Sequence, residues 1–127
     1  MRAAAVVALV LIVSAPALLA AEQIDLEAAR QQFVKSCGTC HSVDPGAKPR
    51  QGPNLHGVFG RRVGQVEGYA YSEALAAGDW HWTEDALDPW LENAQKAHPG
   101  TIMNYRQRSA EKRALIIAYL KALTLEN

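Results

Sequence analysis

The hydrophobic and polar positions of this chain predict a helix near each end of its folded part. In the segment 25–37 the apolar residues recur every three or four positions, which is typical of one helix face. They are Leu26, Ala29, Phe33 and Cys37. A second, broader apolar stripe lies in the segment 109–125 and consists of Ile116, Tyr119, Leu120 and Leu123. Asp25 and Ser109 are suitable N-caps, because their side-chain oxygens can accept hydrogen bonds from free N–H groups of the first turn.

Between these helices the pattern also indicates helical structure. A short helix is expected over 72–77, with Ser72 as its N-cap and Gly78 just past its end. The chain has no alternating pattern that would predict a strand, and it has no internal repeat. We therefore expect an all-α protein with three to five helices.

A proline complicates a further helix that is predicted over 83–93. Proline in a helix interior removes one hydrogen bond and clashes with the preceding turn. Either Thr83 caps a helix that is kinked at Pro89, or Asp88 caps a shorter helix with Pro89 in its first turn. We favour the first arrangement.

The segment 42–71 has almost no helical pattern and is rich in glycine and proline. A loop of about 30 residues is uncommon inside a compact domain. It is understandable if the loop packs on a large rigid ligand instead of on protein. The glycines would then let the backbone approach that ligand closely.

The first 21 residues are typical of a cleaved secretory signal peptide. Arg2 provides the positive start, and an apolar run follows from Ala3 to Val13. This run is shorter than the ~20 residues that a membrane span needs. Ala15-Pro16-Ala17 fits a cleavage pattern, whereas a cut after residue 20 or 21 gives a more usual length. We expect residues 1–21 to be removed and 22–127 to form one domain.

The mature chain is nearly neutral. Without Arg2 it has 12 Lys and Arg residues against 13 Asp and Glu residues, a formal charge of −1. This balance argues against nucleic acid as a partner and gives no sign of binding to an anionic membrane.

The chemistry of the chain is indicated by Cys37-Gly38-Thr39-Cys40-His41, the C-x-x-C-H signature of covalent c-type haem attachment. At a helix end, cysteines three apart can form thioethers with two vinyl groups of one porphyrin, and the histidine can face the iron. Three alternatives remain. A disulfide is usual for two cysteines in an exported protein. A redox dithiol would need a strand before the motif, and a zinc site would need two more ligands at suitable spacing.

Met103 is the candidate for the second axial ligand of the iron, because it is the only methionine outside the expected signal peptide. Most methionines are core filler, but this one ends the turn-rich run Pro99-Gly100-Thr101-Ile102-Met103. Ligation by histidine and methionine raises the potential of a haem.

The chain resembles the class I, mitochondrial-type cytochrome c family over residues 25–125. The resemblance is in a series of motifs in order. They are the C-x-x-C-H motif, Gly52-Pro53-Asn54-Leu55-His56-Gly57-Val58-Phe59-Gly60-Arg61, Gly68-Tyr69-Ala70-Tyr71-Ser72, Trp80-His81-Trp82, Leu91-Glu92-Asn93, the run ending at Met103, and Leu115-Ile116-Ile117-Ala118-Tyr119-Leu120-Lys121. The resemblance implies a cytochrome c fold around one haem c, attached through Cys37 and Cys40, with iron held by His41 and Met103.

The resemblance also implies roles for other residues. The Pro53 carbonyl would accept the ring N–H of His41 and so fix its tautomer. Tyr71, Trp82 and Arg61 would hold a buried haem propionate, since a buried charge needs donors. Thr101 would steady the Met103 loop and the other propionate. At the crossing of the first and last helices, Phe33 would pack against Tyr119 and Ile116.

Several positions depart from the family pattern. Trp90 and Leu75 stand where the family has polar groups near the ligand sulfur, and Ala29 replaces a glycine at the helix crossing. Gln95 and Ile102 occupy positions of docking lysines in the mitochondrial proteins. The mature chain has five lysines, which are Lys35, Lys48, Lys96, Lys112 and Lys121. We therefore expect docking that depends less on lysine, with apolar contact at Ile102 and Tyr105.

The function implied is one-electron transport in the periplasm, not catalysis. Membrane or soluble redox enzymes of a respiratory or photosynthetic chain would serve as donor and acceptor, through transient contacts with a monomer. Two alternatives differ from this: a peroxidase or ligand-sensing haem protein, which needs an open iron site, and a dedicated subunit of one periplasmic oxidoreductase.

Overall fold

The two helices predicted at the ends of the folded part are both present in the computed structural model, which describes residues 23–125. Helix α1 spans Leu26–Cys37 and α5 spans Ala110–Leu125. The Asp25 carboxylate accepts hydrogen bonds from the amides of Glu27 and Ala28 at 2.9 and 3.2 Å. The Ser109 hydroxyl accepts one from the Lys112 amide at 3.3 Å. Both predicted N-caps are therefore confirmed.

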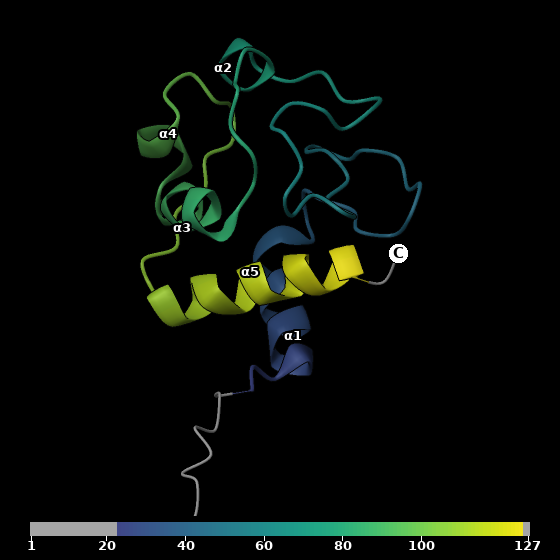
Figure 1. Cartoon of the computed structure of the whole chain (residues 1–127), viewed down its shortest axis with the longest axis vertical. Helices are drawn as coiled ribbons and strands as arrows, with labels where there is room; N and C mark the ends of the chain where they lie inside the picture. Colours follow the sequence, from purple (N-terminus) through teal and green to yellow (C-terminus); the bar gives the residue numbers. More distant parts are fainter. Residues whose placement is uncertain (1–22, 126–127) are drawn as a thin grey trace, which may run out of the picture.

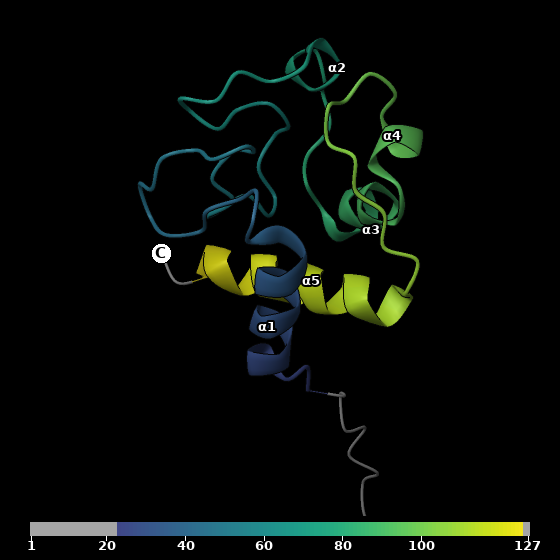
Figure 2. The same ribbon diagram turned by 180° about the vertical axis from the view of Figure 1, so that it is seen from behind.

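Helices α1 and α5 cross each other on one side of the molecule (Figures 1 and 2). Ala29, Phe33 and Ile116 are almost fully buried. The rings of Phe33 and Tyr119 lie 5.0 Å apart at 45°. The predicted contact between the first and last helices is confirmed, and burial of these apolar surfaces provides its stability.

The helix over Pro89 takes the first of the two expected arrangements. Helix α3 spans Glu84–Glu92, with Thr83 at the N-cap position and Pro89 in its interior. Pro89 cannot donate to the carbonyl of Asp85. Because Asp85 and Pro89 are both exposed, water can satisfy that carbonyl. The alternative in which Asp88 caps a shorter helix is wrong.

Two short helices complete the described part of the chain. Helix α2 spans Glu73–Ala76, and Ser72 occupies its N-cap position without a side-chain cap hydrogen bond. The predicted N-cap position of Ser72 is therefore confirmed, although its hydroxyl does not cap the helix. Helix α4 spans Ala94–Ala97 and was not predicted, because four residues show no periodic pattern. The Asn93 side chain caps it by accepting from the Lys96 amide at 3.2 Å.

The glycine-rich segment 42–71 is a loop, as expected, on the side of the molecule away from α3 and α4 (Figures 1 and 2). Asn54 organises it from within. Its buried side chain donates to the carbonyls of Asp44 and Ala47 at 2.8 and 3.0 Å and accepts from the His56 amide at 2.8 Å. Three hydrogen bonds from one side chain replace secondary structure here.

The all-α prediction is confirmed. The five helices of residues 23–125 are accompanied by one isolated bridge, between Arg62 and His81, and by no strand. None of the helices in these residues has the length and apolar character needed to cross a membrane. The expected signal peptide, residues 1–21, lies outside the described residues.

Candidate functional site

The core surrounds a cavity of about 500 Å³. Its walls come from α1, α3 and α5, from the loop that follows α1, and from the segment 101–105. Most of the lining side chains are apolar, and none is Lys, Arg, Asp or Glu. Eight of the nine residues predicted to hold the cofactor line this one cavity: Cys37, Cys40, His41, Pro53, Tyr71, Trp82, Thr101 and Met103. Arg61 does not line it.

The end of α1 brings both cysteines and His41 to the same cavity wall. Cys37 is the last residue of α1, and its carbonyl accepts hydrogen bonds from the amides of Cys40 and His41 at 3.1 and 3.0 Å. Both cysteines are free thiols. Burial, with a smaller effect of Cys40, raises the pKa of Cys37 to about 12. A redox dithiol needs a lowered thiol pKa, so this environment does not fit that alternative.

The His41 imidazole is held in one tautomer. Its Nδ1 lies 2.8 Å from the Pro53 carbonyl oxygen. Since a carbonyl only accepts, Nδ1 carries the proton and Nε2 keeps its lone pair. Burial lowers the pKa of His41, and the hydrogen bond to Pro53 opposes this in part. His41 is therefore neutral at pH 7, as a metal ligand must be.

Gly52 allows this position of the imidazole. A Cβ on residue 52 would overlap the His41 ring atoms Cε1, Nδ1 and Nε2. The backbone is fixed there by a hydrogen bond of 2.8 Å from the Gly52 amide to the Cys40 carbonyl. Thus the loop must pass against the face of the ring, and only glycine leaves room for it.

Met103 approaches the cavity from a separate arm of the chain. The Thr101 hydroxyl, which is buried, accepts a hydrogen bond from the Met103 amide at 3.3 Å. Just before it, Gly100 has φ +93°, where a side chain would be strained. A Cβ there would also lie 3.3 Å from the Cβ of Ala74 in α2. Thr101 and Gly100 thus set the course of the backbone into Met103.

Three hydroxyl groups that line the cavity can each form a hydrogen bond with a polar ligand. Tyr71 accepts a hydrogen bond from the Val66 amide at 3.2 Å, so its own proton remains available. Burial raises the pKa of Tyr71 and keeps it protonated. The hydroxyls of Ser72 and Tyr105 are buried and have no hydrogen-bond partner among residues 23–125. Buried hydroxyls normally have a partner, so an acceptor in the cavity would satisfy them.

This donor set fits a haem better than a simple metal site. Two thiols, a neutral imidazole, a thioether and several hydroxyl donors surround an otherwise apolar space. The described residues contain no group of three or more His, Cys, Asp or Glu side chains that could hold a metal ion by themselves.

Comparison with known proteins decides the family. The family model described as cytochrome c matches residues 26–124. The chain belongs to the cytochrome c family. It is 42% identical to cytochrome c of Guizotia abyssinica over 101 residues, which are 79% of this chain and 91% of that protein. It is 39% identical to cytochrome c2 of Blastochloris viridis over 95 residues, 74% of this chain and 75% of that protein.

The predicted resemblance to the class I family is thereby confirmed. Members of this family carry a covalently attached haem c with its iron, and Cys37 and Cys40 have the spacing for that attachment. They are electron-transfer proteins and not enzymes.

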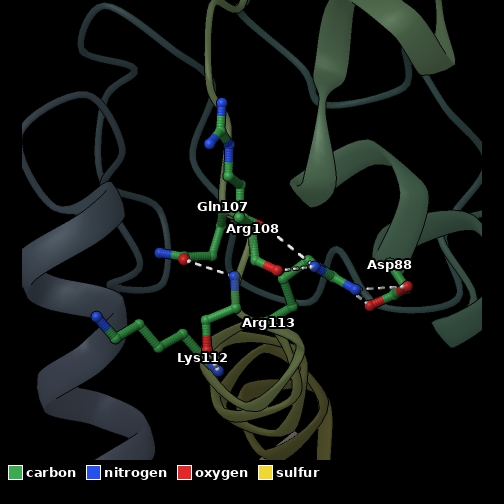
Figure 3. Close-up of polar contacts among 6 residues, drawn as sticks. Asp88, Gln107, Arg108, Lys112 and Arg113 are labelled. Atoms are coloured by element: carbon green, nitrogen blue, oxygen red, sulfur yellow. Dashed lines mark hydrogen bonds and ion pairs between the residues drawn. The ribbon is translucent and has the colours of Figure 1, made fainter.

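In this cytochrome c the chain after Met103 is anchored to α3 and α4. The Ala94 amide donates to the Tyr105 carbonyl at 3.2 Å, and the Gln107 amide donates to the Leu91 carbonyl at 2.8 Å. Arg113 of α5 continues this anchoring (Figure 3). Its Nη1 donates to the carbonyls of Gln107 and Arg108, both at 3.0 Å.

Some of these residues could not be found from the sequence. Arg113 and the hydroxyls of Ser72 and Tyr105 had no predicted role at the site. For Gly52 the prediction was only that loop glycines let the backbone approach a ligand closely, and its contact with His41 was not predicted. Their roles depend on burial and on close contacts between distant segments, for which a single sequence has no signal. Arg61 was expected to hold a propionate, but it lies outside the cavity lining. Its Nη2 lies 3.5 Å from the His56 carbonyl oxygen, and its charge still acts on the pKa of Tyr71.

Proposed function

We propose that this cytochrome c is an exported one-electron carrier whose haem iron is ligated by His41 and Met103. The observation that supports this most is the state of the His41 ring. Its Nδ1 donates to Pro53, so Nε2 is free to bind iron. Met103 lines the same cavity and belongs to a different segment of the chain. One nitrogen and one sulfur ligand from separate segments suit the two axial positions of a haem.

The haem, when bound, supplies an iron that alternates between Fe(II) and Fe(III) and so takes up and gives back one electron. The protein contributes ligands and surroundings. With two protein ligands there is no position left for a substrate, which fits a carrier. Leu75, Trp90 and Ile116 are buried in the cavity wall and exclude water. Low polarity around the site favours the less charged ferrous state.

The polar lining residues would hold the haem propionates. Tyr71 has a free hydroxyl proton, and Trp82 lines the same cavity. Thr101 would add a contact on the Met103 side. Arg61 would act through its charge, since its guanidinium does not reach the cavity lining. Each propionate is an anion that is costly to bury without donors.

The partners would be membrane or soluble redox enzymes that bind transiently to a monomer at the cavity mouth. The exposed lining residues there are Gln51, Ile102 and Asn104, and all are uncharged. Ile102 is 69% exposed. An uncharged rim with one large apolar residue suits a partner with an apolar docking face and gives little electrostatic steering. Nucleic acid does not suit this surface.

Export to the periplasm is proposed from the first 21 residues. A basic start, an apolar run and small residues before Glu22 are the features of a signal peptide.

Expression of the full chain in a bacterium that matures c-type cytochromes tests these proposals together. We expect the haem protein in the periplasmic fraction, a new N-terminus near residue 22, and a mass that includes one haem. The oxidised protein should show the near-infrared band of methionine bound to ferric iron. Changing both Cys37 and Cys40 to Ala should abolish covalent haem, whereas the exposed residue between them is the control, as Thr39→Ala. A cytoplasmic protein would refute export, and covalent haem in the double variant would refute the attachment.

A further inference from the structure

Two aromatic residues outside the haem cavity lie face to face. The ring of His98 is stacked on the indole of Trp80, with centroids 3.8 Å apart and planes 3° from parallel. His98 follows α4 directly and precedes Met103 by five residues. Trp80 lies in the segment that connects α2 to α3. The stack therefore joins two segments that are 18 positions apart in the sequence.

The stack belongs to a cluster of four rings that reaches the cavity wall. Trp80 contacts Trp82 edge to face at 5.8 Å, and His98 lies 5.8 Å from Trp90. Trp82 and Trp90 are themselves 5.2 Å apart, and both line the cavity. A change in the stack can thus reach the wall of the haem site through direct ring contacts.

The fold leaves a specific place for the Trp80 ring. A Cβ on Gly78 would stand 2.5 Å from Trp80 Cζ3 and 2.5 Å from Val63 Cγ1. The Trp80 carbonyl also accepts a hydrogen bond from the Val63 amide at 2.9 Å. The indole Nε1 is buried and has no partner among residues 23–125. The indole is therefore held by packing of its ring and not by its polar atom.

The backbone links the His98 ring firmly to the loop that contains Met103. The His98 amide donates to the Ala94 carbonyl at 3.0 Å, which ties His98 to the first residue of α4. The His98 carbonyl accepts from the Thr101 amide at 3.3 Å, and Thr101 in turn accepts from the Met103 amide. A movement of this loop that carries Met103 away must therefore either break the stack or bend the chain after His98.

We propose that His98 is a positioning residue, whose stack on Trp80 holds the loop 98–103 closed and keeps Met103 in its place. The same contact keeps the His98 imidazole, which could itself bind iron, packed among tryptophans. The inference rests on the proposed function of Met103 as iron ligand.

Competition by free imidazole at pH 7 tests this inference. Imidazole can bind the ferric iron only when Met103 has left, so its apparent affinity is proportional to the open fraction of the loop. His98→Ala should raise that affinity about 2- to 10-fold, the range that corresponds to one aromatic pair. His98→Phe keeps a flat ring and should remain close to the wild type. The exposed neighbour of Trp80 provides the matched control, as His81→Ala, which should not change the affinity.

A second variant and a second measurement complete the test. Gly78→Ala should displace the Trp80 ring and raise the imidazole affinity without any change at His98. Hydrogen exchange of the Thr101 and Met103 amides should become faster in His98→Ala and in Gly78→Ala. Unchanged affinity and unchanged exchange in both variants would refute the inference. So would a His98→Phe variant that behaves like His98→Ala. If the wild type lacks the methionine band, the proposed ligation fails, while hydrogen exchange still measures the effect of the stack on the loop.

Discussion

Arg113 forms a two-point ion pair with Asp88, in which Nε lies 2.7 Å from Oδ1 and Nη2 lies 3.3 Å from Oδ2 (Figure 3). The pair joins the first turn of α5 to the middle of α3. The third nitrogen, Nη1, donates to two backbone carbonyls of the segment that leads away from Met103. A planar guanidinium can satisfy all of these acceptors at once, and an ammonium group cannot.

We expect Arg113→Lys to destabilise the protein although it keeps the charge, because a lysine cannot replace the four hydrogen bonds. Asp88→Asn should lower the stability less, because the Asp88 side chain is 48% exposed and water can take the place of its carboxylate beside Arg113. Thermal unfolding of the haem-bound proteins measures the order. Equal melting temperatures for Arg113→Lys and the wild type would show that charge alone matters.

Met103→Ala should remove the near-infrared methionine band and lower the reduction potential. The choice of axial ligands changes the reduction potential of a haem over a range of roughly 0.8 V, and a thioether ligand stabilises ferrous iron. The variant should also bind carbon monoxide, which the wild type should not. Ile102→Ala changes the exposed neighbour and should leave the spectrum unaltered. Retention of the band in Met103→Ala would mean that Met103 is not the ligand.

Gly52→Ala and Gly60→Ala separate contact with His41 from simple backbone strain. Gly60 has φ +79°, and a Cβ added to it would meet no atom within 4 Å. Its substitution should therefore cost about 1–2 kcal/mol of stability and leave the haem spectrum unchanged. Gly52→Ala should alter the spectrum, because the new methyl group displaces the imidazole. An unaltered spectrum in Gly52→Ala would show that the loop can retreat from the ring.

The rate of electron transfer to the physiological partner should fall only weakly with ionic strength, since the cavity rim is uncharged. Ile102→Lys should slow the reaction by placing a charge on the docking face. Val34→Lys adds the same charge at an exposed apolar position of α1 that does not line the cavity, and it should react like the wild type. A steep salt dependence in the wild type would reveal steering by charges farther from the rim.

His98 should titrate below the ordinary value of 6.5, because burial lowers its pKa. The unfolded chain then binds more protons than the folded one, so stability is fully present above about pH 6.5 and is lost as the pH falls through the lowered pKa. Proton resonances of the imidazole measure the pKa directly. His98→Phe should remove this part of the pH dependence and keep the stack. A pKa above 6.5 would indicate that the tryptophans stabilise the imidazolium instead.

Much of the architecture could be predicted because it depends on neighbours in the sequence. Apolar spacing identified α1 and α5, and the caps Asp25 and Ser109 marked their starts. The choice at Pro89 was harder, since both arrangements satisfied local rules. The fold tolerates the loss of one helix hydrogen bond at Pro89 because that side of α3 is exposed to water. Exposure depends on how the whole protein packs and cannot be derived from local rules.

The proposed chemistry of the site could be predicted from the order of residues, because covalent haem attachment needs two cysteines and a histidine at a fixed spacing. Cys37, Cys40 and His41 are close together in the chain, and Met103 is the single methionine of residues 22–127. Which distant groups meet depends instead on the packing of the whole domain. Packing placed Gly52 against the His41 ring, buried Arg113 between α3 and the segment after Met103, and stacked His98 on Trp80. These contacts join segments that are separated by many residues, and no local propensity encodes such a contact.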